Sequence, residues 1–141
     1  MTGRIMALDV GDRRIGIALS DALMITAQGL ETYTREDDDT EKDVSYIVDL
    51  ATKHNVQKIV FGLPKNMDGT LGFQAEMVQE FARAIKEKFT GETDFFDERG
   101  TTISAHEALR SGGLKTKKHK AVVDKIAAVI ILQAYLERYG G

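Results

Sequence analysis

The chain has 141 residues, of which 43% are hydrophobic and 29% charged, with a formal net charge of −3 and no cysteine. These values predict a globular protein with one domain over residues 1–141, and they exclude disulfides and thiolate metal sites. No apolar run approaches the roughly 20 residues of a membrane span, and the N-terminus has no signal-peptide pattern. We therefore expect a cytoplasmic protein without a membrane partner.

The first three predicted elements form a meander. An apolar run ends near a carboxylate, Asp9, and residues 10–12 then turn the chain. Apolar and small or polar residues alternate over 14–20, which predicts the second strand of a hairpin. A third strand is expected over 25–34, with a bulge or bend at Gly29.

Two helices and a buried strand are expected next. Apolar residues at helical spacing predict a helix over 44–51, with Asp39 or Thr40 as its N-cap. The continuous apolar run 58–63 predicts a strand that is buried on both faces and parallel to a neighbour. A second helix is expected over 73–89. Its core residues would be the apolar ones at steps of four: Phe73, Met77, Phe81, Ile85 and Phe89.

The last third of the chain predicts a strand over 93–96, a helix over about 101–111 and a final helix over about 120–138. The resulting order of elements mixes a meander with crossover units. It predicts an α/β domain with a mixed five-stranded sheet, in which a three-stranded antiparallel meander adjoins parallel strands and helices flank the sheet.

Three acidic positions are candidates for a shared site. Asp9 is expected on a buried strand, either as the residue that shapes its own turn or as an active-site acid. Asp124 lies on the apolar face of the last helix, where the alternative role is stabilisation of the first helical turn. Asp97 and Glu98 point to opposite faces of a strand, so one can face Asp124, and a surface ion pair with Arg99 is the alternative.

Carboxylates gathered on one surface repel one another unless a cation is present. Mg²⁺ or Mn²⁺ fits such a site, and two ions can polarise a phosphodiester, activate water and stabilise the leaving oxygen. The lysine-rich segment 115–120 could bind phosphate or be a solvated loop. The side chains expected to hold a nucleic-acid backbone are Arg13, Arg14, Lys65, Arg99, Lys117, Lys118 and Lys120.

Motifs along nearly the whole chain are similar to those of a known family: Leu8-Asp9-Val10-Gly11 with Gly16-Ile17-Ala18, Phe61-Gly62-Leu63-Pro64 with Asp68-Gly69, Asp97-Glu98-Arg99 with Thr101-Thr102, and Val123-Asp124-Lys125-Ile126-Ala127-Ala128 through Gln133. They resemble the YqgF family, also called RuvX, of pre-16S rRNA nucleases. The resemblance implies a ribonuclease H-like fold, related to RuvC-type Holliday junction resolvases. It also implies that the catalytic, metal-binding acids are Asp9, Glu98 and Asp124.

The expected function is metal-dependent hydrolysis of phosphodiester bonds in 5′-end processing of pre-16S rRNA, during ribosome biogenesis. The expected partners are structured RNA or branched DNA and ribosomal precursor particles, and the chain would be a monomer or a homodimer. One alternative is a Holliday junction resolvase acting on four-way DNA, which should be a symmetric dimer. Others are a catalytically silent RNA-binding assembly factor and an actin- or sugar-kinase-like ATPase, which would need a second such domain.

Overall fold

The structure is a computed structural model that describes residues 3–11, 13–35, 39–64, 72–97 and 117–139, with the main chain alone over 117–122. Five strands form one sheet in the order β3-β2-β1-β4-β5. The strands are β1 (Arg4–Val10), β2 (Arg14–Ser20), β3 (Ala27–Thr34), β4 (Val56–Leu63) and β5 (Glu92–Asp97). The helices are α1 (Thr40–Lys53), α2 (Phe73–Lys88) and α4 (Lys117–Tyr139).

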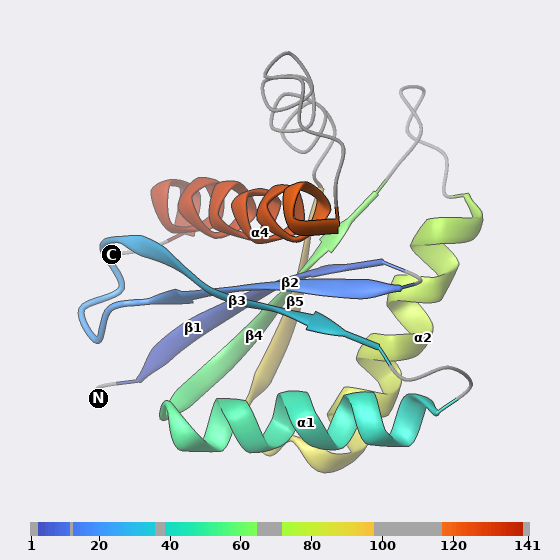
Figure 1. Ribbon diagram of the computed structural model, residues 1–141. Helices are drawn as coiled ribbons and strands as arrows, with labels where there is room; N and C mark the ends of the chain where they lie inside the picture. The colour runs from blue at the N-terminus through green and yellow to red at the C-terminus, as the bar shows by residue number, and fades with distance from the viewer. Residues whose placement is uncertain (1–2, 12, 36–38, 65–71, 98–116, 140–141) are drawn as a thin grey trace.

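Main-chain pairing confirms the expected mixed sheet. The β1, β2 and β3 strands are antiparallel neighbours, whereas β4 is parallel to both β1 and β5. Helix α4 covers one face of the sheet, and α1 and α2 cover the other (Figure 1). The helix expected over 101–111 lies outside the described residues. None of the described helices is long and apolar enough to span a membrane.

Alternation along β1 decides which side chains meet which helix. Met6 and Leu8 belong to the core on the α1–α2 face, whereas Ile5 and Ala7 belong to the core under α4. Successive side chains of a strand point to opposite faces, so Asp9 continues the row of Ile5 and Ala7 toward α4. The first strand therefore presents one carboxylate to the α4 face.

The sequence predicts that the third strand begins at residue 25, but β3 begins at Ala27. The reason is that the preceding loop has its own hydrogen bonds. The Asp21 carboxylate accepts bonds from the amides of Ile25 and Thr26, at 2.7 and 3.0 Å. These bonds hold the loop in a turn instead of in the sheet. The bulge expected at Gly29 is confirmed, because the pairing of β2 with β3 shifts register beside it.

Asp39 is the N-cap of α1, as expected, since its carboxylate accepts a bond from the Lys42 amide at 3.1 Å. The core expected for α2 is partly wrong, because the Phe73 side chain is 81% exposed. Residues four apart advance about 40° beyond a full turn, so four such steps rotate about 160° around the helix. The buried stripe instead combines spacings of three and four residues, with two neighbouring positions at its centre: Ala75, Val78, Phe81, Ala82 and Ile85.

Candidate active site

Asp9 lies at the carboxyl end of β1, the edge at which α/β sheets bind ligands. It is half-buried and is paired across the sheet with Gly16 of β2. Directly paired residues of antiparallel strands project to the same face, so Gly16 also faces α4. The turn that follows is closed by the main chain, with the Gly11 amide donating to the Arg14 carbonyl at 2.8 Å.

Gly16 brings α4 down onto the sheet. A Cβ atom at this position would overlap the carbonyl oxygen of Asp124, so no other residue fits without moving the helix. The main chain of Asp124 therefore lies against Gly16, the cross-strand partner of Asp9. The structure thus places Asp9 and Asp124 on one face of the sheet, in neighbouring positions.

Asp124 is the eighth residue of α4, because the helix begins at Lys117 and not at residue 120 as expected. Stabilisation by the helix dipole falls off within the first turn, so the dipole does not explain this acid. Its Oδ2 atom lies 2.7 Å from Nε of Arg14, in a partly buried ion pair whose side chains are 27% (Arg14) and 18% (Asp124) exposed. Arg14 therefore supplies the positive charge beside Asp124.

Asp97 ends β5 and pairs with Leu63 of β4. Asp97 is two residues after Phe95, so both side chains point to the same face of the sheet. Phe95 packs against the α1–α2 core, whereas Phe96 packs against the α4 core. Asp97 therefore lies on the face opposite Asp9. The other two residues of this motif, Glu98 and Arg99, lie outside the described residues.

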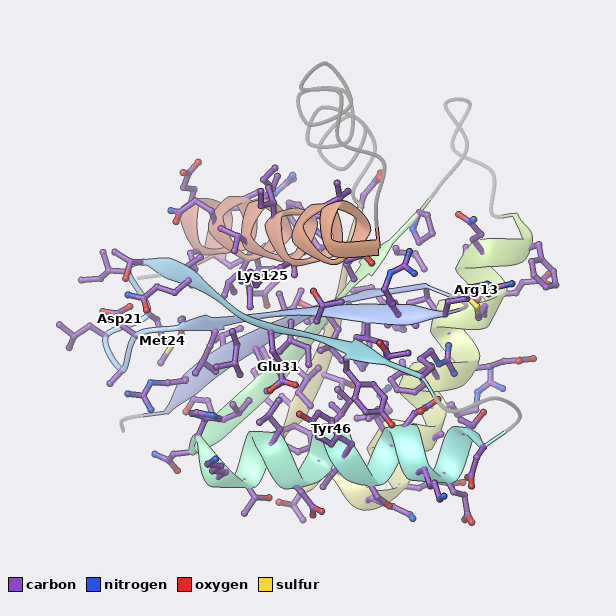
Figure 2. The ribbon with its side chains drawn as sticks, in the orientation of Figure 1. Arg13, Asp21, Met24, Glu31, Tyr46 and Lys125 are labelled. Carbon is purple, nitrogen blue, oxygen red and sulfur yellow. The ribbon has the colours of Figure 1, made fainter. Side chains whose placement is uncertain are left out.

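The basic candidates have different surroundings. Arg13 is exposed at the turn of the β1–β2 hairpin, at the end of β2 far from Asp21 (Figure 2). Arg14, expected from the sequence to bind nucleic acid, also holds Asp124. Three candidates begin α4, where only the main chain is described: Lys117, Lys118 and Lys120. Lys65 lies outside the described residues.

Two carboxylates on one face are donors that suit a hard divalent cation such as Mg²⁺. Among the described residues, however, no three His, Asp or Glu side chains gather closely enough to hold a metal ion. The third acid implied by the family resemblance is Glu98, which is not described. The described part of the site therefore fits a metal centre in donor chemistry and supplies two of its expected ligands.

Two features of the site were not predicted from the sequence. One is the close approach at Gly16, and the other is the ion pair between Arg14 and Asp124. The strand alternation contained a signal for both, because it places Arg14 and Gly16 on the same face as Asp9. Strand alternation could not predict the position of α4, because the two partners of the ion pair are 110 residues apart.

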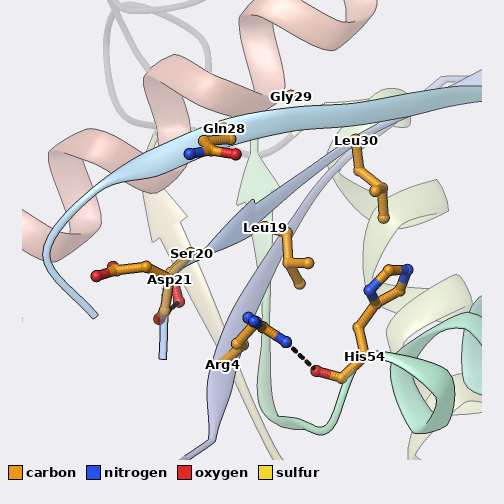
Figure 3. Close-up of a pocket in the computed structure, with 8 residues that line it drawn as sticks. All are labelled: Arg4, Leu19, Ser20, Asp21, Gln28, Gly29, Leu30 and His54. Carbon is orange, nitrogen blue, oxygen red and sulfur yellow. Dashed lines mark hydrogen bonds between the residues drawn. The ribbon is translucent and has the colours of Figure 1, made fainter. Parts of the chain in front are cut away.

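A cavity of about 250 Å³ lies at the opposite end of the sheet (Figure 3). Arg4 and Ser20, which line it, are the first residue of β1 and the last of β2. Arg4 is five positions from Asp9, or about 16 Å along a strand. The cavity is therefore separate from the paired acids.

Comparison with known proteins identifies the family of this chain. A family model described as "RuvX: Holliday junction resolvase" matches residues 3–138. The chain belongs to the RuvX family. A relative from Clostridium tetani, named "Putative pre-16S rRNA nuclease", is 50% identical over 134 residues, which are 95% of this chain and 96% of the relative. A relative of the same name from Halalkalibacterium halodurans is 48% identical and covers 96% of each chain.

Solved structures share the fold of this RuvX chain. RuvC of Thermus thermophilus in complex with a Holliday junction substrate matches with a TM-score of 0.58 and 12% identity, over 98% of this chain and 96% of that one. The fowlpox virus Holliday junction resolvase matches with a TM-score of 0.57 and 14% identity, over 96% and 99%. The family and the ribonuclease H-like fold expected from the sequence are confirmed.

Proposed function

We propose that the protein is a metal-dependent nuclease that hydrolyses phosphodiester bonds, and that its reaction is 5′-end processing of pre-16S rRNA in cytoplasmic ribosomal precursor particles. The observation that carries this proposal is the placement of Asp9 and Asp124 on one face of the sheet by the close contact at Gly16. It is supported by relatives that are 48–50% identical over nearly their whole length and whose name states this substrate.

The residues have separate roles in this proposal. Asp9, Glu98 and Asp124 would hold Mg²⁺ or Mn²⁺, two ions in all, and Arg14 would neutralise Asp124 until the metal binds. When bound, a divalent ion supplies an activated water nucleophile and neutralises charge on the leaving oxygen. The phosphate backbone of the substrate would be held by the basic side chains around the site: Arg13, Arg14, Lys65, Arg99, Lys117, Lys118 and Lys120.

The test is cleavage of an RNA that carries the 5′ end of pre-16S rRNA, with Mg²⁺ or Mn²⁺, beside a four-way DNA junction. We expect Asp9→Asn and Asp124→Asn each to lower RNA cleavage by about 100-fold or more, because a metal ligand matters at least as much as its supporting residues. Asp49→Asn is the matched control, since Asp49 is exposed on α1, on the other face of the sheet. It should leave cleavage unchanged.

A Holliday junction resolvase is the second candidate, and the description of the matching family favours it. Cleavage of the junction alone, lost in the same two variants, would replace the RNA substrate by branched DNA. Cleavage of either substrate that persists in both variants would contradict the proposed site. RNA binding with no cleavage of either substrate would support the silent assembly factor.

A further inference from the structure

The turn that follows Asp9 is bound by an arginine from a later part of the chain. Arg35 comes directly after β3, and its main-chain amide donates a hydrogen bond to the carbonyl of Arg13 at 2.9 Å. Its Nη1 atom donates to the carbonyl of Gly11, also at 2.9 Å. These two carbonyls flank position 12, so Arg35 binds the hairpin turn on both sides.

Arg35 is itself fixed by a buried carboxylate. Asp43, in the first turn of α1, is 1% exposed, and its Oδ2 accepts a bond from Nε of Arg35 at 2.9 Å. The Tyr33 hydroxyl donates to Oδ1 of the same carboxylate at 2.9 Å. The guanidinium carbon also lies 5.1 Å from the ring centroid of Phe81 in α2. One side chain thus connects the hairpin turn to both helices of the α1–α2 face.

The geometry requires an arginine. The guanidinium uses Nε for the carboxylate and Nη1 for the carbonyl, whereas a lysine has one nitrogen and a different reach. The Arg35 side chain is only 12% exposed, so few water molecules could replace a lost bond. Buried ion pairs are often no better for stability than apolar residues of similar volume, which points to orientation as the role of this pair.

We propose that Arg35, anchored by Asp43, is a positioning residue that fixes the β1–β2 turn and thereby sets Asp9 and Arg14 against α4. Asp9 lies two residues before one bonded carbonyl, and Arg14 lies one residue after the other. A shift of the turn therefore moves both, and a misplacement of about 1 Å can cost about 100-fold in rate. The catalytic consequence rests on the proposed nuclease function, whereas the structural consequence does not.

Two variants remove this support in different ways. Arg35→Lys keeps the charge and loses the fork of donors. The double variant Arg35→Met with Asp43→Leu replaces the ion pair by apolar volume, so the fold should survive. The matched control is Arg4→Lys, because Arg4 Nη1 donates to the carbonyl of His54 at 3.2 Å, at the far end of the sheet (Figure 3).

The first measurement is amide hydrogen exchange by NMR on the full chain without divalent ions. We expect the Gly11 amide to exchange about tenfold faster in both support variants, because each loses a hydrogen bond to the turn. It should be unchanged in Arg4→Lys, and the buried Ile17 amide of β2 should stay within about twofold in all variants. Exchange at Gly11 that matches the wild type in the double variant, or that rises equally at Ile17, would overturn the proposal.

The second measurement is cleavage of the RNA substrate. We expect Arg35→Lys to lower kcat by about tenfold or more with KM within about twofold, as a positioning residue should, and Arg4→Lys to match the wild type. A loss confined to KM would overturn the proposal by making Arg35 a substrate-binding residue. If the wild type cleaves no nucleic acid, the proposed function fails, and exchange at Gly11 still decides whether Arg35 positions the turn.

Discussion

Nε of Arg14 lies 2.7 Å from Oδ2 of Asp124, so an ion pair joins the β1–β2 hairpin to α4. Arg14 shares its face of β2 with Gly16, on which the main chain of Asp124 rests. The acid is therefore held twice, by the contact of its main chain with the sheet and by the charge on its side chain. Any cation that binds Asp124 through Oδ2 competes with Arg14.

Replacing Arg14 should separate these two contributions. We expect Arg14→Gln to lower the free energy of unfolding by about 1–2 kcal/mol without divalent ions, because the pair is partly buried and Asp124 keeps its charge. In the proposed metal site, the same variant should gain more stability from added Mg²⁺ than the wild type does, since no arginine competes for Asp124. Urea unfolding with and without Mg²⁺ measures both effects.

Arg13→Gln is the control for that experiment. Arg13 is the neighbouring arginine and is exposed at the turn, so its replacement should change the free energy of unfolding by less than about 0.5 kcal/mol. Equal losses in Arg13→Gln and Arg14→Gln would show that the ion pair contributes nothing of its own.

Gly16→Ala adds a single methyl group but should be strongly destabilising. The added Cβ meets the main chain of Asp124, and a helix cannot be moved as cheaply as a side chain, so we expect a loss of about 1–3 kcal/mol. At Gly29 a Cβ meets the Lys125 side chain instead, at 2.7 Å from Cγ, and that side chain can rotate away. Gly29→Ala should therefore cost less in urea unfolding, and the reverse order would argue against the close contact of α4.

The corrected stripe of α2 can be tested with two phenylalanines. Phe81 is 2% exposed, and Phe81→Ala should cost about 3–5 kcal/mol of the free energy of unfolding. Phe73 is 81% exposed, so Phe73→Ala should change it by less than about 0.5 kcal/mol. Thermal or urea unfolding of the two variants measures the difference, and a similar cost for both would restore the stripe expected from steps of four.

Tyr46 of α1 predicts a loss of stability at alkaline pH. Its hydroxyl donates to the Glu31 carboxylate of β3 (Figure 2), and this bond, with burial, raises the pKa of Tyr46 to about 12 from 10.0. A group whose pKa is raised by folding stabilises the fold below its unfolded pKa, and that contribution is lost as the pH rises from about 10 to about 12. Urea unfolding across this range should show a steeper loss in the wild type than in Tyr46→Phe. Parallel curves would mean that the bond to Glu31 is absent in solution.

The order and type of the described elements followed from local patterns. Strand alternation in β1 and β2 predicted the hairpin, and Asp39 predicted the start of α1, because each signal involves residues a few positions apart. The limits of β3 and α4 were wrong by two and three residues. For β3 the reason is the Asp21 loop, whose hydrogen bonds compete with the sheet.

The sequence by itself also determined which acids to examine, because a carboxylate is unusual on an apolar strand or helix face, and Asp9 and Asp124 both stood out for that reason. Only the tertiary structure decided that these two lie together, that Arg14 neutralises Asp124, and that Arg35 binds the turn after Asp9. The physical reason is that these contacts join residues up to 110 positions apart. Their geometry depends on how closely α4 and α1 pack on the sheet, which no local periodicity encodes.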